Sequence, residues 1–344
     1  MFKLEHPSIG MLGAGTWGIA LARMLQMNGC AVTVWSALAE EIETLTATRR
    51  HPKLPDVALP EGILYTTDLS LACQDKDILV MAVPSVFVRE TARKIRPHIA
   101  KGQIVVDVAK GIEDGTLLTM TEIIADELSG LEPRLVALSG PTHAEEVSMD
   151  MPTAIVSACE DHGVAQYVQQ VFSNNFLRVY TNTDVKGVEI CGSLKNVIAL
   201  ATGISAGLGY GDNAKAALIT RGIAEIARLG TAAGCTSATF SGLTGLGDLV
   251  VTCTSRHSRN NRAGFLMGQG VAPEEAIRQV GMVVEGVNTL PAAVAMAEKY
   301  QVELPIIQTV NAVVHGGMRP KDAVNALLGR EMKSEVPVDF LSNG

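Results

Sequence analysis

The stretch SIGMLGAGTWGIALARML, residues 8–25, decides the class of fold. It opens with a short apolar run typical of a buried strand and closes with an amphipathic pattern of helical period. Between the two, Gly13, Gly15 and Gly18 form a GxGxxG motif. A strand that passes through such a loop into a helix is the context in which this motif predicts dinucleotide binding.

Each glycine of this loop has its own expected role. We expect Gly13 to allow the tight turn, Gly15 to let the backbone approach a pyrophosphate, and Gly18 to let the helix pack closely on the strand. The N-terminus of the helix adds free N–H groups and the positive end of its dipole. The alternative is that the three glycines serve packing alone.

Short apolar runs alternate with helical patterns over the first half of the chain. The strand candidates are residues 9–12, 31–35, 78–83, 104–108 and 135–138, and the helical patterns cover 17–27, 86–95 and 117–128. Such alternation predicts a doubly wound parallel sheet with helices on both faces. Two further strands, 153–157 and 176–179, enclose another helix, and the proline-rich segment 49–62 is expected to be a surface loop.

The character of the sequence changes after about residue 185. Ala-rich amphipathic segments follow one another at 213–234, 273–280, 286–298 and 321–328. This pattern predicts a Rossmann-type α/β domain over residues 1–185, followed by an all-α domain over residues 186–344. No Pro/Gly/Ser-rich linker separates the two parts, so we expect them to share an extensive interface.

Composition narrows the class of protein. The net charge of −8 argues against nucleic acid as a partner, and an anionic substrate would need a local cationic pocket. Six cysteines without a CxxC pair are typical of reduced thiols in a cytosolic protein, and they indicate no metal site. We find no secretion signal and no apolar run of about 18 residues, so we expect a cytoplasmic protein without a membrane span.

The choice between the two nicotinamide dinucleotides depends on the end of the second strand. An acid at that place would bind the ribose hydroxyls of NAD, but the position is occupied by Ser36. Glu40 and Glu41 come a little later, and Arg49 and Arg50 later still. No acid is expected where it would repel a 2′-phosphate, and no arginine stands at the strand end to require one, so NADPH and NADH both remain open.

Two further strands deliver polar residues to the same edge of the sheet. IVVDVAKGIE, residues 104–113, places Lys110 just beyond a strand, and ALSGPTHAEEV, residues 137–147, places Gly140 and Thr142 beyond the next. Open α/β sheets bind ligands outside the carboxyl ends of their strands. We therefore expect these residues to contact a ligand, although a solvated loop lysine is the alternative for Lys110.

A lysine stands inside an apolar helical stretch, EICGSLKNVIALATGISAGLGYGDN, residues 189–213. Lys195 shares a helix face with Cys191, Ile198 and Thr202. It either reaches out to water or is buried, and burial lowers the pKa of a lysine until it can act as general base or, protonated, as general acid. The surrounding glycines are expected to let backbone and substrate approach each other closely.

A third polar cluster follows in GLGDLVVTCTSRHSRN, residues 245–260. Ser258, Arg259 and Asn260 begin a predicted helix, and a guanidinium beside a helix N-terminus suits an anion such as phosphate. The alternative for Arg259 is a surface ion pair. Asp248 follows two glycines and by itself is more typical of a loop cap than of a catalytic acid.

These residues resemble the NAD(P)-dependent glycerol-3-phosphate dehydrogenases in their bacterial soluble form. The resemblance extends over essentially the whole chain. It is carried by GAGTWG at 13–18, VPS at 83–85, AKG at 109–111, SGPTHAEE at 139–146, GSLKNVIALATGISAGLGYGDN at 192–213, GLTGLGDLVVTCTS at 242–255, SRN at 258–260 and VEG at 284–286. One departure is Ser36, which replaces a basic residue or histidine frequent in the family.

The resemblance implies site residues. Lys195 matches the proton acceptor of the family. The positions matching substrate contacts are Lys110, Gly140, Thr142, Lys195, Asp248, Ser258, Arg259 and Asn260. Those matching cofactor contacts are Gly13, Gly15, Thr16, Trp17, Gly18, Ser36, Lys110, Ala144, Arg259, Val283 and Glu285.

The implied reaction is the reversible reduction of dihydroxyacetone phosphate to sn-glycerol 3-phosphate by NADPH or NADH, which supplies glycerophospholipid synthesis. The nicotinamide gives the hydride and Lys195 exchanges the proton. A homodimer is expected from the apolar helical half. One alternative is a related β-hydroxyacid dehydrogenase with a carboxylate substrate, and the other is a non-catalytic NAD(P)-binding sensor, which would not need Lys195, Asp248 and Arg259 together.

Overall fold

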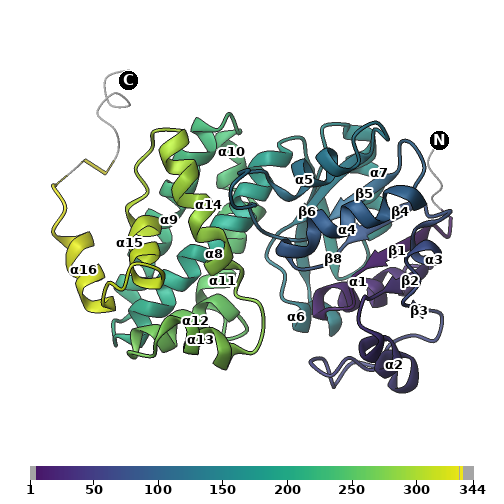
Figure 1. Cartoon of the computed structure of the whole chain (residues 1–344), viewed down its shortest axis with the longest axis horizontal. Coiled ribbons are helices and arrows are strands. Elements are labelled where there is room, and N and C mark those ends of the chain that lie inside the picture. The colour runs from purple at the N-terminus through teal and green to yellow at the C-terminus, as the bar shows by residue number, and fades with distance from the viewer. Residues whose placement is uncertain (1–4, 333, 336–344) are drawn as a thin grey trace.

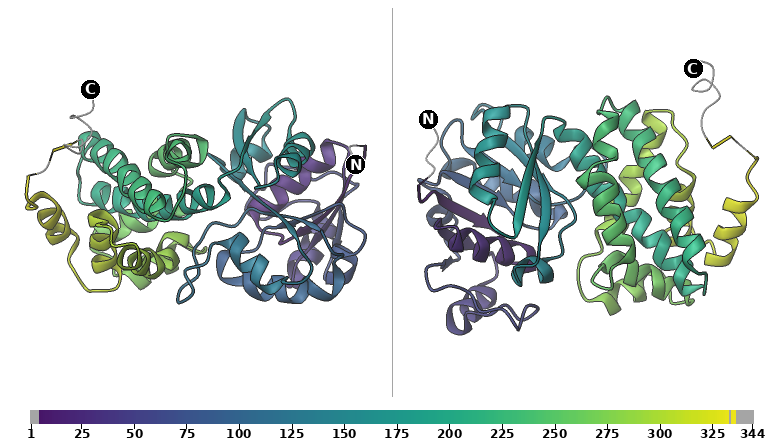
Figure 2. Two further views of the ribbon diagram at one scale, coloured as in Figure 1. Left: turned by 90° about the horizontal axis from the view of Figure 1, so that it is seen from above. Right: turned by 180° about the vertical axis from the view of Figure 1, so that it is seen from behind.

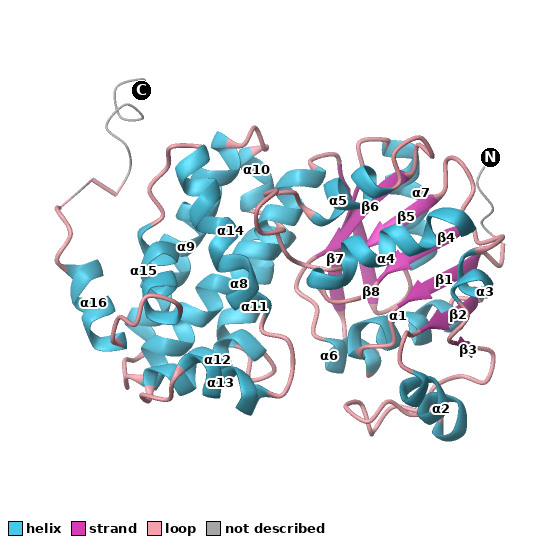
Figure 3. Cartoon of the chain, in the orientation of Figure 1, coloured by secondary structure: helices cyan, strands magenta, loops and turns pink. Residues whose placement is uncertain are grey.

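The computed structural model describes residues 5–332, 334 and 335, which form two halves lying side by side (Figure 1). One half contains an eight-stranded sheet with helices on both faces, and the other is helical over its described residues (Figure 3). Views from above and from behind show the same separation (Figure 2). The predicted class, a Rossmann-type doubly wound sheet followed by an all-α part, is confirmed.

The sheet has the strand order β3-β2-β1-β4-β5-β6-β7-β8. Its strands are β1 (Ser8–Leu12), β2 (Ala31–Trp35), β3 (Leu64–Thr66), β4 (Ile78–Met81), β5 (Ile104–Asp107), β6 (Arg134–Ser139), β7 (Thr153–Ala158) and β8 (Leu177–Asn182). Strands β1 to β6 pair in parallel, whereas β6 and β7 pair antiparallel. The predicted parallel sheet is wrong for the direction of β7 and β8, because an apolar run marks a buried strand without giving its direction.

Most of the predicted helices of the first half are present. The helices there are α1 (Thr16–Met27), α2 (Ala39–Thr48), α3 (Leu69–Cys73), α4 (Val88–Ile95), α5 (Met120–Glu127), α6 (Ala144–Ser148) and α7 (His162–Phe172). The sequence analysis missed β3, α3, α2 and the five-residue α6. Strand β3 and helix α3 are very short, and α2 fully buries one side chain, that of Leu45, so it has no broad apolar face to reveal it. The segment 49–62 is a loop, as predicted.

The second half is built around one central helix. Its helices are α8 (Val185–Gly207), α9 (Asp212–Ala232), α10 (Ser237–Phe240), α11 (Asp248–Thr254), α12 (Arg259–Gly268), α13 (Pro273–Val280), α14 (Glu285–Lys299), α15 (Pro305–Val314) and α16 (Pro320–Leu328). By length and composition α8 could cross a membrane, yet 89% of its most apolar window is buried inside the molecule. Packing in a protein core accounts for that apolar character.

Glycines let α8 and α12 cross almost in backbone contact. A Cβ at Gly203 would lie 2.1 Å from the carbonyl oxygen of Asn261, and one at Gly264 would lie 2.2 Å from a carbonyl oxygen of α8. Gly207 and Gly268 meet the facing helix in the same way. The glycines that follow Lys195 on α8 therefore make room for α12, and the expectation that they make room for the substrate is wrong for them.

The two halves are joined along the first turns of α8. The carboxylate of Glu189 accepts hydrogen bonds from the hydroxyl of Thr119 (2.7 Å) and from the backbone N–H of Thr121 (2.8 Å), at the N-terminus of α5. Beside them, Lys186 forms an ion pair with Glu122 at 2.9 Å. These contacts hold the start of α8 against the sheet half, and they fix where the middle of α8 lies relative to the strand ends.

Candidate active site

Lys195 lies in the middle of α8, in a buried position. Its side chain is 7% exposed, so it does not reach out to water. The ammonium donates hydrogen bonds to the carboxylate of Asp248 and, at 2.7 Å, to the hydroxyl of Thr252. Both partners come from α11, which packs beside α8.

Asp248 bridges two lysines, one from each half of the molecule. Its Oδ1 accepts from Lys195, and its Oδ2 accepts from Lys110 Nζ at 2.7 Å. The side chain is 1% exposed, and it belongs to the first residue of α11, directly after a π-helical turn, Leu243–Gly247. The interpretation of Asp248 as a loop cap is wrong, because sequence spacing does not show that both lysines converge on it.

The electrostatics of this cluster tune the lysine. Burial lowers the pKa of Lys195 to about 7; the negative charge of Asp248 opposes the shift, and the positive charge of Lys110 adds to it. Burial alone would raise the pKa of Asp248, but the two ammonium groups outweigh it and keep that pKa below its usual value. Near neutral pH the site therefore contains a permanent carboxylate beside a lysine that can give up or take a proton.

The strand-end residues of β6 surround the same lysines. Lys110 Nζ also donates to the carbonyl oxygen of Gly140 at 3.3 Å, and the hydroxyl of Thr142 donates to that same oxygen at 3.2 Å. Gly140 has a φ of +154°, and a Cβ there would meet the backbone of Ile155 at 2.9 Å. The predicted strand-end residues Lys110, Gly140 and Thr142 thus lie together, and Ala144 begins α6 just beyond them.

A histidine that the sequence analysis did not single out lies at this place. Burial lowers the pKa of His143, and the nearby positive charge of Lys195 lowers it further. The buried Nε2 of His143 has no hydrogen-bond partner among the described residues. Its ring centroid lies 5.7 Å from that of His257, next to Ser258. The position within SGPTHAEE was a signal that it lies near the site, but not that its ring points inward.

The predicted anion site is the start of α12. Ser258 caps this helix, its hydroxyl accepting from the N–H of Asn261 at 3.2 Å. Asn260 is turned inward, where it donates to Asn196 at 3.0 Å and accepts from the N–H of Gly286 at 2.9 Å. Arg259 has no ion-pair partner within the described part of the chain, so the surface ion pair considered as its alternative is absent there.

The glycine loop is shaped to receive a phosphate. A Cβ at Gly13 would lie 2.6 Å from the carbonyl oxygen of Ala82, and one at Gly18 would lie 2.3 Å from that of Gly13. Around the Cβ position of Gly15, in contrast, there is no atom within 4 Å. Helix α1 begins at Thr16 without a side-chain cap, so its first N–H groups are free for an anion. This arrangement fits a bound pyrophosphate.

A contact between the halves lies beside the predicted cofactor residues of α14. Glu285, the first residue of α14, accepts from the N–H of Ser85 at 3.2 Å and from its hydroxyl at 2.5 Å. Ser85 begins a short 3₁₀ helix after β4, and Val283 precedes α14. Sequence reasoning missed the contact of Ser85, although the VPS motif marked its position.

Comparison with known proteins agrees with this geometry. Family models described as the N-terminus and the C-terminus of NAD-dependent glycerol-3-phosphate dehydrogenase match residues 8–165 and 184–325. The chain belongs to this family. It is 59% identical over 332 residues to glycerol-3-phosphate dehydrogenase [NAD(P)+] 2 of Lactobacillus delbrueckii subsp. bulgaricus, covering 95% of this chain and 98% of that protein.

Two more relatives extend the likeness to sequence and structure. The glycerol-3-phosphate dehydrogenase [NAD(P)+] of Bacillus subtilis is 49% identical over 330 residues, covering 95% of this chain and 96% of that one. The crystal structure of glycerol-3-phosphate dehydrogenase from Coxiella burnetii is 36% identical, with a TM-score of 0.91, covering 95% of this chain and all of that one. Both domains of the family are therefore present in this chain.

For a dehydrogenase of this family, the end of β2 matters for the choice of cofactor. Ser36 is buried there, and its hydroxyl donates to the carboxylate of Glu41 at 2.6 Å while accepting from the N–H of Leu38 at 3.1 Å. Glu41 is thereby held at the strand end. The expectation that no acid lies at this place is wrong, because it rested on distance along the chain and α2 folds back.

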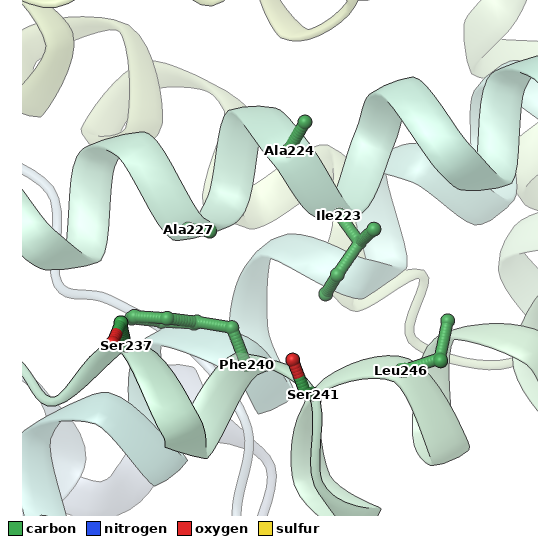
Figure 4. A pocket seen from close by; sticks show the side chains of 7 residues that line it. All are labelled: Ile223, Ala224, Ala227, Ser237, Phe240, Ser241 and Leu246. Carbon is green, nitrogen blue, oxygen red and sulfur yellow. The ribbon is translucent and has the colours of Figure 1, made fainter. Parts of the chain in front are cut away.

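Two hollows lie elsewhere in the helical half. One, of about 190 Å³, is lined mainly by apolar and small side chains of α9 and α10 (Figure 4). The other, of about 770 Å³, lies among α9, α15 and α16. Within the described part of the chain, no group of three or more His, Cys, Asp or Glu side chains is arranged to hold a metal ion.

Proposed function

We propose that this protein catalyses the reversible NAD(P)H-dependent reduction of dihydroxyacetone phosphate to sn-glycerol 3-phosphate. The observation that carries the proposal is the buried Lys195, whose pKa is lowered to about 7 and which is bonded to Asp248 beside Lys110. A proton carrier of this kind is needed when a carbonyl becomes an alcohol. The names of the relatives support the choice of substrate, and the free N–H groups at the start of α12 support a binding site for its phosphate.

The cofactor belongs mainly to the sheet half. When bound, the nicotinamide supplies the hydride. We assign its pyrophosphate to the free N–H groups of the glycine loop and the start of α1. The residues proposed to hold the cofactor are Gly13, Gly15, Thr16, Trp17, Gly18, Ser36, Lys110, Ala144, Arg259, Val283 and Glu285.

The substrate lies between the halves in this proposal. Its phosphate is held by Arg259 and by the free N–H groups at the start of α12, because a guanidinium and a helix N-terminus both favour a dianion. The remaining contacts are assigned to Lys110, Gly140, Thr142, Lys195, Asp248, Ser258 and Asn260. The inward bonds of the Asn260 side chain favour a role for it in holding α12 and α14, with its backbone facing the phosphate.

Lys195 acts in both directions. In the reduction, its ammonium polarises the C2 carbonyl oxygen and donates a proton to it as the alcohol forms. In the oxidation, the neutral amine accepts the proton of the C2 hydroxyl. Asp248 holds the lysine in place, while burial lowers the pKa of Lys195, with the charge of Asp248 opposing the shift and that of Lys110 adding to it. The two lysines supply the positive charge that the developing alkoxide needs, so the proposed reaction requires no metal.

The test is the oxidation of NADPH and of NADH by the purified protein, with dihydroxyacetone phosphate and, in parallel, with a β-keto carboxylate of similar size. We expect turnover with the phosphate ester. Turnover with the carboxylate alone would instead support the β-hydroxyacid dehydrogenase alternative. Cofactor binding without turnover of either substrate would support the sensor.

We propose domains over residues 1–185 and 186–344, supported by the start of α8 at Val185. A homodimer through the helical half is supported by exposed apolar side chains there, such as Phe265, and light scattering in solution tests it. The six buried free thiols support a place in the cytoplasm, and the substrate class supports a supply of glycerophospholipid precursors.

A further inference from the structure

We infer that Glu41 binds the hydroxyls of the adenosine ribose and makes this enzyme prefer NADH to NADPH. The inference rests on the proposed function, because it concerns the cofactor of the same site. It comes from the position of one carboxylate relative to the glycine loop and from the few cations near it: Arg49 and Arg50 donate to loop carbonyls, which leaves the exposed Lys53.

The carboxylate of Glu41 lies beside the glycine loop. The glycine loop is tied to the end of β2, since the N–H of Gly13 donates to the carbonyl oxygen of Trp35 at 2.9 Å. Ser36 follows Trp35 and holds Glu41 through its hydroxyl at 2.6 Å. The carboxylate therefore lies at the strand end next to the loop, where an acid in a Rossmann fold binds the ribose. It reaches this place from the first turn of α2.

Glu41 is half-buried, and one of its oxygens accepts from Ser36, which leaves lone pairs on the carboxylate for further donors. Ser36 has given its one donor to Glu41 and one acceptor lone pair to the N–H of Leu38, so it cannot donate to the ribose and can accept only one further hydrogen bond. The serine thus orients the acid, and the acid is the group that can accept from two ribose hydroxyls.

Few positively charged side chains are near Glu41 along the chain. The residues between Ser36 and the helix, Ala37 and Leu38, carry no charge. Arg49 and Arg50, the nearest arginines along the chain, donate to the carbonyl oxygens of Pro60 (3.1 Å) and Pro55 (2.6 Å), so their guanidinium groups are engaged in the loop.

One histidine and one lysine lie closer to Glu41. His51 interacts with the backbone of Ala14 in the glycine loop. Burial lowers the pKa of His51, which disfavours a positive charge on its ring. His51 is also close enough to Glu41 and Lys53 for their charges to shift its pKa, Glu41 raising it and Lys53 lowering it. Lys53 is exposed and is left as the candidate cation for a 2′-phosphate.

The physical consequence follows from these steps. A ribose with free hydroxyls gives the carboxylate two donors, whereas a 2′-phosphate places a dianion against it. We expect the wild-type protein to bind ADP-ribose at least about tenfold more tightly than 2′-phospho-ADP-ribose, a modest figure for like charges at contact distance near a protein surface.

The experiment compares two adjacent acids. Affinities for ADP-ribose and its 2′-phosphate are measured by calorimetry on the full chain without substrate, for the wild type, Glu41→Gln and Glu40→Gln. Glu40 is exposed on the same helical turn, and no hydrogen bond joins it to Ser36 in the described structure. Glu41→Gln should reduce the discrimination about tenfold, because it removes the repulsion, while Glu40→Gln should leave it near the wild-type value. The ratio of kcat/KM for NADH and NADPH should change in the same sense.

Two results would overturn the inference. One is that the wild type binds 2′-phospho-ADP-ribose more tightly than ADP-ribose. Loss of that preference in Lys53→Ala would then assign it to Lys53 in the loop 49–62. The other is an equal effect of Glu40→Gln and Glu41→Gln, which would reduce the role of Glu41 to general surface charge. Because the binding assay needs no turnover, failure to reduce dihydroxyacetone phosphate would contradict the proposed function and leave this test intact.

Discussion

The two halves of the molecule use glycine for opposite purposes. In the sheet half, the space beside Gly15 is open, next to a helix whose first N–H groups are free. In the helical half, the spaces beside Gly203 and Gly264 are filled by the backbone of the facing helix. A glycine-rich sequence therefore does not distinguish room for a ligand from room for a helix. In our proposal, the sheet half binds the cofactor through exposed backbone, and the helical half positions Lys195 by close helix packing.

The largest expected effect tests this division directly. Lys195→Met should lower kcat about 10²–10⁴-fold, because it removes the general acid. Affinity for NADH, measured by fluorescence titration, should stay within about twofold, since we assign the cofactor mainly to the other half. A folded variant that loses cofactor binding and turnover together would contradict the division of labour.

A matched pair of glycine substitutions comes next. Gly203→Ala should destabilise the protein by about 1–3 kcal/mol or more, because the new Cβ meets a backbone oxygen that cannot move aside easily. Gly15→Ala should leave the melting temperature almost unchanged, since its φ of −66° suits alanine and the space is open. The second variant should instead raise the KM for the cofactor. Similar melting curves for the two variants would remove the contrast between the halves.

The phosphate site of the helical half should show a smaller effect. Arg259→Ala should raise the KM for dihydroxyacetone phosphate about tenfold or more, the size expected for a lost charged hydrogen bond, with a smaller change for the cofactor. Arg262→Ala, an exposed arginine on the same helix, serves as the control. If both variants keep the wild-type KM, Arg259 does not hold the phosphate.

The last prediction concerns pH, where the effect close to neutral pH is small. Because the pKa of Lys195 is lowered to about 7, its charged form is lost as pH rises through that value. The kcat for reduction should therefore fall above about pH 7, by about tenfold per pH unit once the amine is mostly neutral, and kcat for the oxidation should fall below it. A rate of reduction that stays constant to pH 9, with chemistry rate-limiting, would show that Lys195 is not the proton donor.

The sequence was most informative where local pattern and position coincide. Lys110 follows a strand with an apolar run, and its place at the edge of the sheet was predicted from that fact alone. Lys195 could be placed on a helix, but the choice between water and the core could not be made, because Asp248 is 53 residues away along the chain. Lys110, the second lysine bonded to Asp248, is 138 residues from Asp248 along the chain, so no sequence periodicity could connect them.

Other features had no local signal. Glu41 belongs to a helix that buries little, so neither the helix nor its fold back to Ser36 was predicted. The contact between Ser85 and Glu285 spans 200 residues and depends on how the halves meet. The VPS and VEG motifs marked Ser85 and Glu285, and the strand end marked Ser36, while the contacts of these residues were set by tertiary packing.

The bonds between Glu189 and the start of α5 have a consequence for protein engineering. Helix α8 carries Glu189 at one end and Lys195 further along, so the joint between the halves and the reacting group share one rigid element. A chimaera that joins the sheet half of one relative to the helical half of another would need a matched Thr119 and Thr121 opposite Glu189 to place its lysine correctly. The halves can therefore be exchanged only if the contact residues between them, Glu189, Thr119 and Thr121, are kept matched.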